Sequence, residues 1–284
     1  MYEKIIIGYD DSAYSLAAVR EVVAWINRHS GTAEIVHGFY FDEEEFGIKP
    51  DLLKLRAEEG KKACLRAQEM AAGLGVAMDF SIREGDPHDV IVHTAQEKGA
   101  GLIVLGTYGR RGIKRLIMGS VTAKVILDAP CDVLVVKNPC DDCTGRYNRI
   151  LVPFDGSPLS RKALDTACRL AKLDRSQVTA LYVIPRYEEM MDFLKTTGVK
   201  NSLRNEAENI MAVARNLADG QAVAIRTEIK EGSAADKTVE AAEHKETDMI
   251  VMGSHGWRGF DKSIIGSTAE RVIMATPCPV LITR

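Results

Sequence analysis

The chain has 284 residues, of which 46% are hydrophobic and 27% are charged, and its formal net charge is −3 at pH 7. This length and apolar content favour two domains, each with its own buried core. The small net charge gives no broad attraction to nucleic acid or to an anionic membrane, and no apolar run approaches the ~18 residues of a membrane span. The chain starts in a predicted strand without a signal-peptide pattern, and its six cysteines form no disulfide framework, so we expect a cytoplasmic protein.

Strand-like and helix-like segments alternate along the first half of the chain. Continuous apolar runs, which are typical of buried parallel strands, occur at 4–9, 34–40, 77–82, 102–106 and 132–136. Stretches with helical character lie between them, at 15–29, 51–72, 87–98 and 120–127. The second half repeats the pattern, with strands expected at 149–154, 178–184, 222–229, 249–253 and 279–283. The alternation predicts an α/β fold of two Rossmann-like, doubly wound domains, each with a five-stranded parallel sheet flanked by helices.

One glycine pattern occurs twice, with the same spacing and 147 residues apart. Each copy lies between a predicted strand and a predicted helix; the positions are Gly106, Gly109, Gly119 and Ser120, and then Gly253, Gly256, Gly266 and Ser267. The aspartate that ends the first strand of each half, Asp10 or Asp155, repeats at an offset of 145. A period this long indicates two similar domains rather than a solenoid. We assign 1–138 to the first domain, 139–147 to a polar linker and 148–284 to the second domain.

The context of the glycines favours an anion site. Glycines let backbone N–H groups approach a phosphate, and a helix N-terminus adds unpaired donors and the positive end of its dipole. In a doubly wound sheet, ligands bind beyond the carboxyl ends of the strands, where the strand order reverses. We therefore expect the glycines and the N–H groups of Ser120 and Val121 to hold phosphates, Asp10 to accept from a ribose hydroxyl or a base, and Ser120 to cap its helix. The alternative is a tight turn, with Asp10 and Asp155 only capping strand ends.

The strand-end aspartate and the Gly-x2-Gly-x9-Gly-Ser pattern resemble the ATP-binding signature of the universal stress protein family, here in a tandem two-domain form. Stretches at 155–160 and 277–280 are also similar to that family, so the resemblance covers nearly the whole chain. It implies that the first and fourth strands are neighbours. It also implies that the last strands of the two halves pair, which would relate the domains by an internal pseudo-twofold axis and make the chain a monomeric pseudo-dimer or a homodimer. One departure is Asp11, where the second half has Gly156.

The segment after each glycine pair contains an aligned arginine. Arg111 and Arg258 each precede a glycine, and these cations could close over a triphosphate. Solvated loops are the alternative interpretation.

Three further side chains carry possible chemistry. Cys140 and Cys143 occur only in the linker, where we expect exposed thiols, with a redox pair or half of a zinc site as alternatives. His255 lies between two motif glycines, but Tyr108 has the equivalent position and no nucleophile or orienting carboxylate accompanies it. We therefore expect no catalytic residue and no dedicated metal site.

The pattern as a whole indicates a nucleotide-binding, stress-response protein in which ATP, or AMP or ADP, acts as a bound regulatory ligand. A Walker Gly-Lys-Ser/Thr is absent, and no catalytic base or acid pair for a metal accompanies the loop, so we expect little or no turnover, although slow hydrolysis is compatible with the pattern. Two alternatives are a ligand-free interaction scaffold and an adenylating enzyme of the related nucleotide α-hydrolase type. Beyond the nucleotide we expect an unidentified protein partner, and no nucleic acid or membrane.

Overall fold

The computed structural model describes residues 1–39, 50–109, 118–137, 145–185, 197–244, 246–257 and 264–284. The chain divides into two compact units, Met1–Arg146 together with Arg284, and Tyr147–Thr283. The division falls inside the predicted linker, of which residues 139–144 are outside the described part. Among the described residues, no helix combines the length and the apolar character that crossing a membrane requires.

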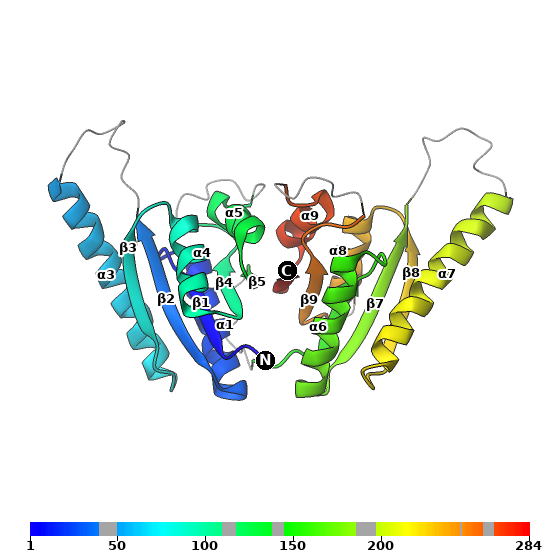
Figure 1. The fold of residues 1–284 in the computed structure, drawn as a ribbon, viewed down its shortest axis with the longest axis horizontal. Helices are drawn as coiled ribbons and strands as arrows, with labels where there is room; N and C mark the ends of the chain where they lie inside the picture. The colour runs from blue at the N-terminus through cyan, green and yellow to red at the C-terminus, as the bar shows by residue number, and fades with distance from the viewer. Residues whose placement is uncertain (40–49, 110–117, 138–144, 186–196, 245, 258–263) are drawn as a thin grey trace. The chain divides into compact units, whose positions relative to one another are not determined.

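The first unit alternates strands and helices (Figure 1). Its strands are β1 (Lys4–Gly8), β2 (Thr32–Phe39), β3 (Asp79–Glu84), β4 (Leu102–Gly106) and β5 (Asp132–Val136). Its helices are α1 (Ala13–His29), α3 (Pro50–Gly73), α4 (Pro87–Lys98) and α5 (Ser120–Asp128).

The second unit repeats this sequence of elements. Its strands are β6 (Arg149–Pro153), β7 (Gln177–Ile184), β8 (Ile225–Glu231), β9 (Met249–Gly253) and β10 (Val280–Thr283). Its helices are α6 (Pro158–Asp174), α7 (Thr197–Asp219), α8 (Ala234–His244) and α9 (Ser267–Ala275). The predicted α/β class with two Rossmann-like domains is confirmed.

The strands of each unit form a parallel sheet with one order. That order is β3-β2-β1-β4-β5 in the first unit and β8-β7-β6-β9-β10 in the second. Ile7 of β1 lies opposite Ile35 of β2 on one side and Val104 of β4 on the other. The strand order therefore reverses between β1 and β4, and likewise between β6 and β9. Because parallel strands end at the same edge of a sheet, the residues after β1 and β4 meet there, as expected.

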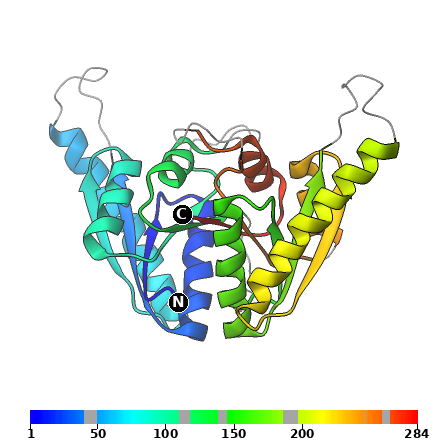
Figure 2. The ribbon, with the colours of Figure 1, turned by 45° about the vertical axis from the view of Figure 1, so that its right-hand side comes forward.

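Helices pack on the sheets in pairs (Figure 2). In the first unit α1 contacts α3 and α4 contacts α5, and in the second unit α6 contacts α7 and α8 contacts α9. Each of these helices also contacts a strand, or packs on a helix that contacts a strand. A parallel sheet covered in this way is buried on both faces, which explains why its central strands are continuous apolar runs.

A serine fixes the start of the first helix in each unit. The Ser12 hydroxyl accepts from the Ser15 N–H at 3.1 Å, and the Ser157 hydroxyl accepts from the Ser160 N–H at 3.3 Å. Such a side chain satisfies one of the backbone donors that a helix N-terminus leaves unpaired. Both caps follow the strand-end aspartate by two residues, so they also set the path of the loop that carries it.

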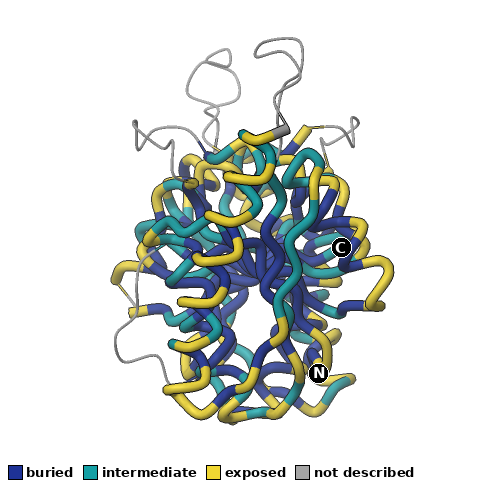
Figure 3. Tube along the Cα trace, turned by 90° about the vertical axis from the view of Figure 1, so that its left-hand side faces the viewer, coloured by how far each residue is buried: buried dark blue, intermediate teal, exposed yellow. Residues whose placement is uncertain are grey.

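The core of each unit lies on its central strands, and exposed residues lie on the outer helices and turns (Figure 3). Ile5, Ile6 and Ile7 of β1 and Ile103 of β4 are at most 2% exposed. Their burial anchors the ends of β1 and β4, from which the loops of interest emerge.

Two strands begin later than the sequence pattern predicts. The apolar runs placed strands at 77–82 and 222–229, whereas β3 covers Asp79–Glu84 and β8 covers Ile225–Glu231. Val76 and Met78 are buried but lie in the connection from α3, before β3 begins. Within their units β3 and β8 pair along one side only, so their residues are half-buried and many are polar. Buried apolar residues just before each strand contribute to the core instead of pairing in the sheet.

We predict that Gly106→Ala destabilises the first unit. A Cβ at this position would lie 2.6 Å from the Tyr14 carbonyl carbon and 2.8 Å from the Ser15 nitrogen, which are backbone atoms of α1. Forcing apart such packing costs about 1–3 kcal/mol. Gly73→Ala is the control, because a Cβ there meets nothing within 4 Å and alanine favours the helix by about 0.5–1 kcal/mol. Thermal denaturation followed by circular dichroism measures both; a wild-type midpoint for Gly106→Ala would contradict the packing described.

Candidate functional site

The strand-end aspartate and the glycine loop of the first unit meet at the carboxyl edge of the sheet. Gly109 passes so close to Asp10 that a Cβ on it would lie 2.7 Å from the Asp10 Oδ2. The other carboxylate oxygen of Asp10, Oδ1, accepts from the Ser12 N–H at 3.1 Å. A side chain at 109 would therefore have to displace the Asp10 carboxylate, and the loop brings two of the predicted site residues together.

The two ends of the glycine loop are joined by the backbone. The Gly119 N–H donates to the Thr107 carbonyl at 3.1 Å, and the Thr107 N–H donates to the Val136 carbonyl of β5 at 2.9 Å. The Thr122 hydroxyl of α5 donates to the Gly106 carbonyl at 2.9 Å. These bonds hold the first turn of α5 directly beside the end of β4.

The N-cap of α5 is Gly119, which corrects the expectation that Ser120 caps the helix. Ser120 is instead the first helical residue, and the N-cap makes no side-chain hydrogen bond to the helix. The same holds in the second unit, where Gly266 is the N-cap of α9 and Ser267 is its first residue. A glycine cap places no side chain oxygen over the first N–H groups of the helix, which leaves that space to a ligand anion.

The second unit reproduces the arrangement. The Ser157 N–H donates to the Asp155 Oδ1 at 2.9 Å, and Gly256 abuts the Asp155 Oδ2, where a Cβ would collide. The Gly266 N–H donates to the Ser254 carbonyl at 2.9 Å and closes the loop. A Cβ on Gly253 would come within 2.6 Å of the Leu159 side chain. Two sequences that differ at most positions thus place the same constellation at the same edge.

A cavity of about 1020 Å³ opens at this edge of the first unit. One end is formed by the glycine loop and the start of α5, including Gly109, Gly119, Ser120 and Val121. The other end is formed by β2 and one face of α3, including His37, Leu52, Leu55, Arg56 and Glu59. Asp10 also lines the cavity. Its size matches the upper part of the range for small-molecule sites.

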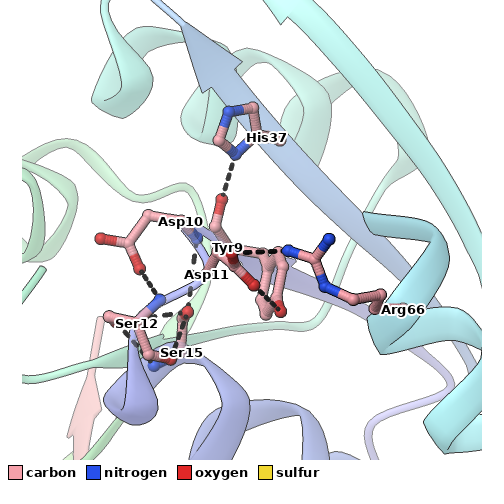
Figure 4. A network of polar contacts seen from close by, with 7 residues as sticks. All are labelled: Tyr9, Asp10, Asp11, Ser12, Ser15, His37 and Arg66. Atoms are coloured by element: carbon pink, nitrogen blue, oxygen red, sulfur yellow. Dashed lines mark hydrogen bonds and ion pairs between the residues drawn. The ribbon is translucent and has the colours of Figure 1, made fainter. Parts of the chain in front are cut away.

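A polar network ties the loop after β1 to α3 in the first unit (Figure 4). The Asp11 carboxylate accepts from the Tyr9 hydroxyl at 3.1 Å and forms an ion pair with Arg66 of α3 at 2.7 Å. The His37 Nδ1 lies 2.7 Å from the Tyr9 carbonyl, so this nitrogen carries the proton. The second unit has Phe154, Gly156 and Val213 at the positions of Tyr9, Asp11 and Arg66, and therefore cannot form the network.

Asp11 adopts a left-handed backbone conformation, which residues other than glycine seldom adopt. Its φ is 64°, close to the 77° of the equivalent Gly156. A left-handed conformation costs an L-residue roughly 1–2 kcal/mol, least for asparagine and aspartate. The two units therefore share one loop shape at this position. The first unit adds a carboxylate, which forms an ion pair with Arg66.

Burial keeps the neighbouring ionisable side chains in their neutral form. Desolvation, reinforced by the charge of Asp11 and the hydrogen bond to it, raises the pKa of Tyr9 well above its usual value, so the phenol remains a donor. Desolvation and the Asp11 charge also raise the pKa of the Cys64 thiol to about 12. A thiol with such a pKa is a poor nucleophile at neutral pH.

A histidine surrounded by carboxylates, which the sequence analysis missed, lies beside Asp86, a residue that lines the same cavity. His88 Nδ1 is 2.8 Å from Asp86 and Nε2 is 3.1 Å from Asp89, and Lys124 pairs with Asp86 at 3.3 Å. Although partial burial acts to raise it, the bonds from His88 and Lys124 hold the pKa of Asp86 below its usual value. The Asp-x-His-Asp spacing at a helix start was the available signal. These groups satisfy one another, and they stabilise the start of α4.

The remaining predicted side chains fall in different places. The Nδ1 of His255 lies 3.0 Å from the hydroxyl of Ser254, and Ser254 is 1% exposed. Arg111, Arg258, Cys140 and Cys143 lie outside the described residues, so the predictions made for them stay predictions.

Comparison with known proteins places the chain in a family. The model of the universal stress protein family matches residues 1–137 and again residues 146–284. The chain therefore belongs to the universal stress protein family and carries its domain twice, as the sequence resemblance indicated.

Individual relatives agree with this assignment. The chain is 25% identical over 295 residues to a universal stress protein of Mycolicibacterium smegmatis, with 99% of this chain and 96% of the relative covered. It is 35% identical over 144 residues to universal stress protein MJ0531 of Methanocaldococcus jannaschii, with 49% of this chain and 82% of the relative covered. A crystal structure of a universal stress protein from Archaeoglobus fulgidus has the same fold, with a TM-score of 0.73 at 20% identity and coverage of 99% and 98%.

We predict that Asp11→Ala and Asp11→Gly differ in stability. Alanine loses the contacts to Arg66 and Tyr9 and keeps the left-handed strain that the wild type already has, so the lost contacts should cost about 1 kcal/mol. Glycine loses the same contacts but relieves the strain, and a half-exposed ion pair contributes only about 0–1 kcal/mol, so we expect stability near that of the wild type.

Gly156→Ala in the second unit is the matched control for strain alone. Its φ is 77°, and a Cβ there would meet only Ile210, at 3.9 Å. Chemical denaturation of the three variants measures the differences. Equal stabilities for Asp11→Ala and Asp11→Gly would show that backbone strain at this position has no weight.

Proposed function

We propose that this tandem universal stress protein binds adenine nucleotides, with ATP as a regulatory ligand that is turned over slowly or not at all. The proposal is carried by one observation, made twice: a glycine-capped helix N-terminus lies beside a strand-end carboxylate at the switch point of a parallel sheet. The resemblance of these residues to an ATP-binding signature supports the choice of adenine nucleotide.

The loop and α5 suit the phosphates. Gly119 begins α5 without a capping side chain, and Gly119, Ser120 and Val121 all line the cavity. Backbone N–H groups at a helix start bind anions through hydrogen bonds and through the helix dipole. Lys124, one turn further along and also at the cavity, adds a positive charge.

Asp10 suits the sugar. Its carboxylate is oriented by the Ser12 N–H and lies against Gly109, so it stands between the phosphate end and the β2 end of the cavity. A carboxylate accepts two hydrogen bonds from a vicinal diol. The accessible apolar side chains of Phe39, Leu52 and Leu55 offer a surface for the flat base.

The described residues around Asp10 favour binding over chemistry. Cys64 stays protonated, and Tyr9 is held as a donor to Asp11. Asp86, which lines the cavity, and the neighbouring Asp89 are engaged by His88. Phosphoryl transfer requires a positioned nucleophile and a metal held against the phosphates, whereas these groups are engaged with one another.

Two alternative functions make different predictions. A ligand-free interaction scaffold would show no affinity for nucleotide. An adenylating enzyme would form an acyl- or aminoacyl-adenylate, for which the loops at 8–12 and 153–157 lack the expected Ser-Gly-Gly-x-Asp-Ser-like sequence. We propose the regulatory ligand role because both units retain the complete loop.

We predict that ATP binds with up to two equivalents per chain, and that Gly119→Val combined with Gly266→Val abolishes binding. A Cβ on Gly119 would already lie 3.2 Å from the Thr107 carbonyl, and the branches of valine would enter the phosphate space. Isothermal titration calorimetry with ATP, ADP and AMP measures the effect, and circular dichroism checks the fold. Unchanged ATP affinity in the double variant would overturn the loop assignment, and no affinity in the wild type would favour the scaffold.

We predict that steady-state ATP hydrolysis is far below ~10 per second, the turnover of a typical enzyme. The reason is that Asp86, a carboxylate that lines the cavity, is already bonded to His88 and Lys124 and is not held free as a base or a metal ligand. Phosphate release is measured with and without Mg²⁺, using the double glycine variant as the control for contaminating ATPases. Release at several per second that disappears in the variant would establish an enzyme instead.

A further inference from the structure

Trp257 of the second unit is an exposed aromatic side chain next to the glycine motif. It follows Gly256 directly, and its side chain is 63% exposed. Among the large hydrophobic side chains of the described residues, only Ile264, at 65%, is more exposed. An indole in water leaves a large apolar face accessible, so the ring of Trp257 is available for contact with a ligand.

The indole is held in a defined place. Its Nε1–H donates to the carbonyl oxygen of Asp155 at 2.9 Å, across 102 positions of sequence. Asp155 is the residue whose carboxylate we propose for the sugar. The ring is therefore attached to the backbone of the ligand-binding aspartate.

Three neighbouring groups then surround Asp155. Gly256 abuts its Oδ2, the Ser157 N–H orients its Oδ1, and Trp257 is bonded to its carbonyl. A nucleotide whose sugar reached this carboxylate would bring its base or its sugar face within reach of the indole. Tryptophan stacks on any base because every base has a π-face, and such stacking is sequence-tolerant and strong.

The first unit does not encode this element. The residue after Gly109 is Arg110, so the equivalent position carries a cation. The two units thus share the phosphate loop and the aspartate but differ in the side chain that follows the second glycine.

We propose that Trp257 is a ligand-contacting residue of the second unit, where its indole forms an aromatic platform for the purine base of the bound nucleotide. This inference rests on the proposed function and assigns to the second site a recognition element of its own. The chemical class of ligand is a purine nucleotide rather than a phosphate alone.

The test isolates the second site by silencing the first with Asp10→Ala and Gly119→Val. In this background, ATP affinity is measured by calorimetry for the parent, Trp257→Ala, Trp257→Phe and Ile264→Ala. We expect Trp257→Ala to weaken ATP binding about tenfold or more, because base stacking is lost. Trp257→Phe retains an aromatic face and should stay within about threefold of the parent. Ile264→Ala is the matched control, since Ile264 is as exposed as Trp257, and it should leave ATP affinity unchanged.

Inorganic tripolyphosphate distinguishes stacking from a structural effect. It has phosphates but no base, so Trp257→Ala should leave its affinity unchanged. Equal losses for ATP and tripolyphosphate would mean that Trp257 only supports the loop, and unchanged ATP affinity in Trp257→Ala would also overturn the platform. Equal effects of Trp257→Ala and Ile264→Ala would assign the exposed side chains to a protein partner or to loop packing instead.

Fluorescence provides a direct readout, because the chain has only two tryptophans. Trp25→Phe leaves Trp257 as the sole indole, and ATP should change its emission whereas tripolyphosphate should not. Because Trp25 is buried, at 5% exposure, this variant can lose its fold. The emission of wild type minus that of Trp257→Phe then gives the same signal.

Failure of this inference is separable from failure of the proposed function. A protein that binds ATP at the first unit and ignores Trp257 at the second retains the proposed function and loses the platform. A wild-type protein that binds no nucleotide at either unit loses both.

Discussion

The close approach of the glycine loop to the strand-end carboxylate is the constraint on which the site depends. β1 and β4 are neighbours in a parallel sheet, so the chain leaves both strands at one edge and must turn in opposite directions. The Gly109 backbone passes against the Asp10 Oδ2, so a side chain at 109 would push the carboxylate out of its place. The same contact between Gly256 and Asp155 shows that the geometry follows from the sheet and not from the surrounding sequence.

Duplication of this geometry allowed the two units to diverge around it. The first unit adds Asp11, held in a left-handed conformation and paired with Arg66, which links the aspartate loop to the helix lining the cavity. The second unit keeps glycine at that position and instead places Trp257 on the carbonyl of Asp155. Under the proposed function, the shared backbone would hold the phosphates in both units and the different side chains would contact the rest of the ligand.

The sequence was most informative where a backbone constraint recurs. The glycines, Asp10 and Asp155 could be selected because each half repeats them in the same strand and helix context. Ser120 was misassigned as the N-cap because a serine before a helix usually caps it, whereas the bond from Gly119 to Thr107 starts α5 one residue earlier. β3 was displaced by two residues because Val76 and Met78 are apolar for core contact and not for strand pairing.

Periodicity and repetition in the sequence by themselves determined the α/β class, the duplication and the positions of the two glycine loops, because these depend on local patterns of burial and on backbone freedom. Contacts between residues far apart in the chain were decided only by the tertiary structure. Arg66 reaches Asp11 across 55 positions, and Trp257 reaches Asp155 across 102. Such pairs leave no periodic trace, since each depends on where the sheet brings a helix or a loop, and the residue types that form each pair occur in one unit only.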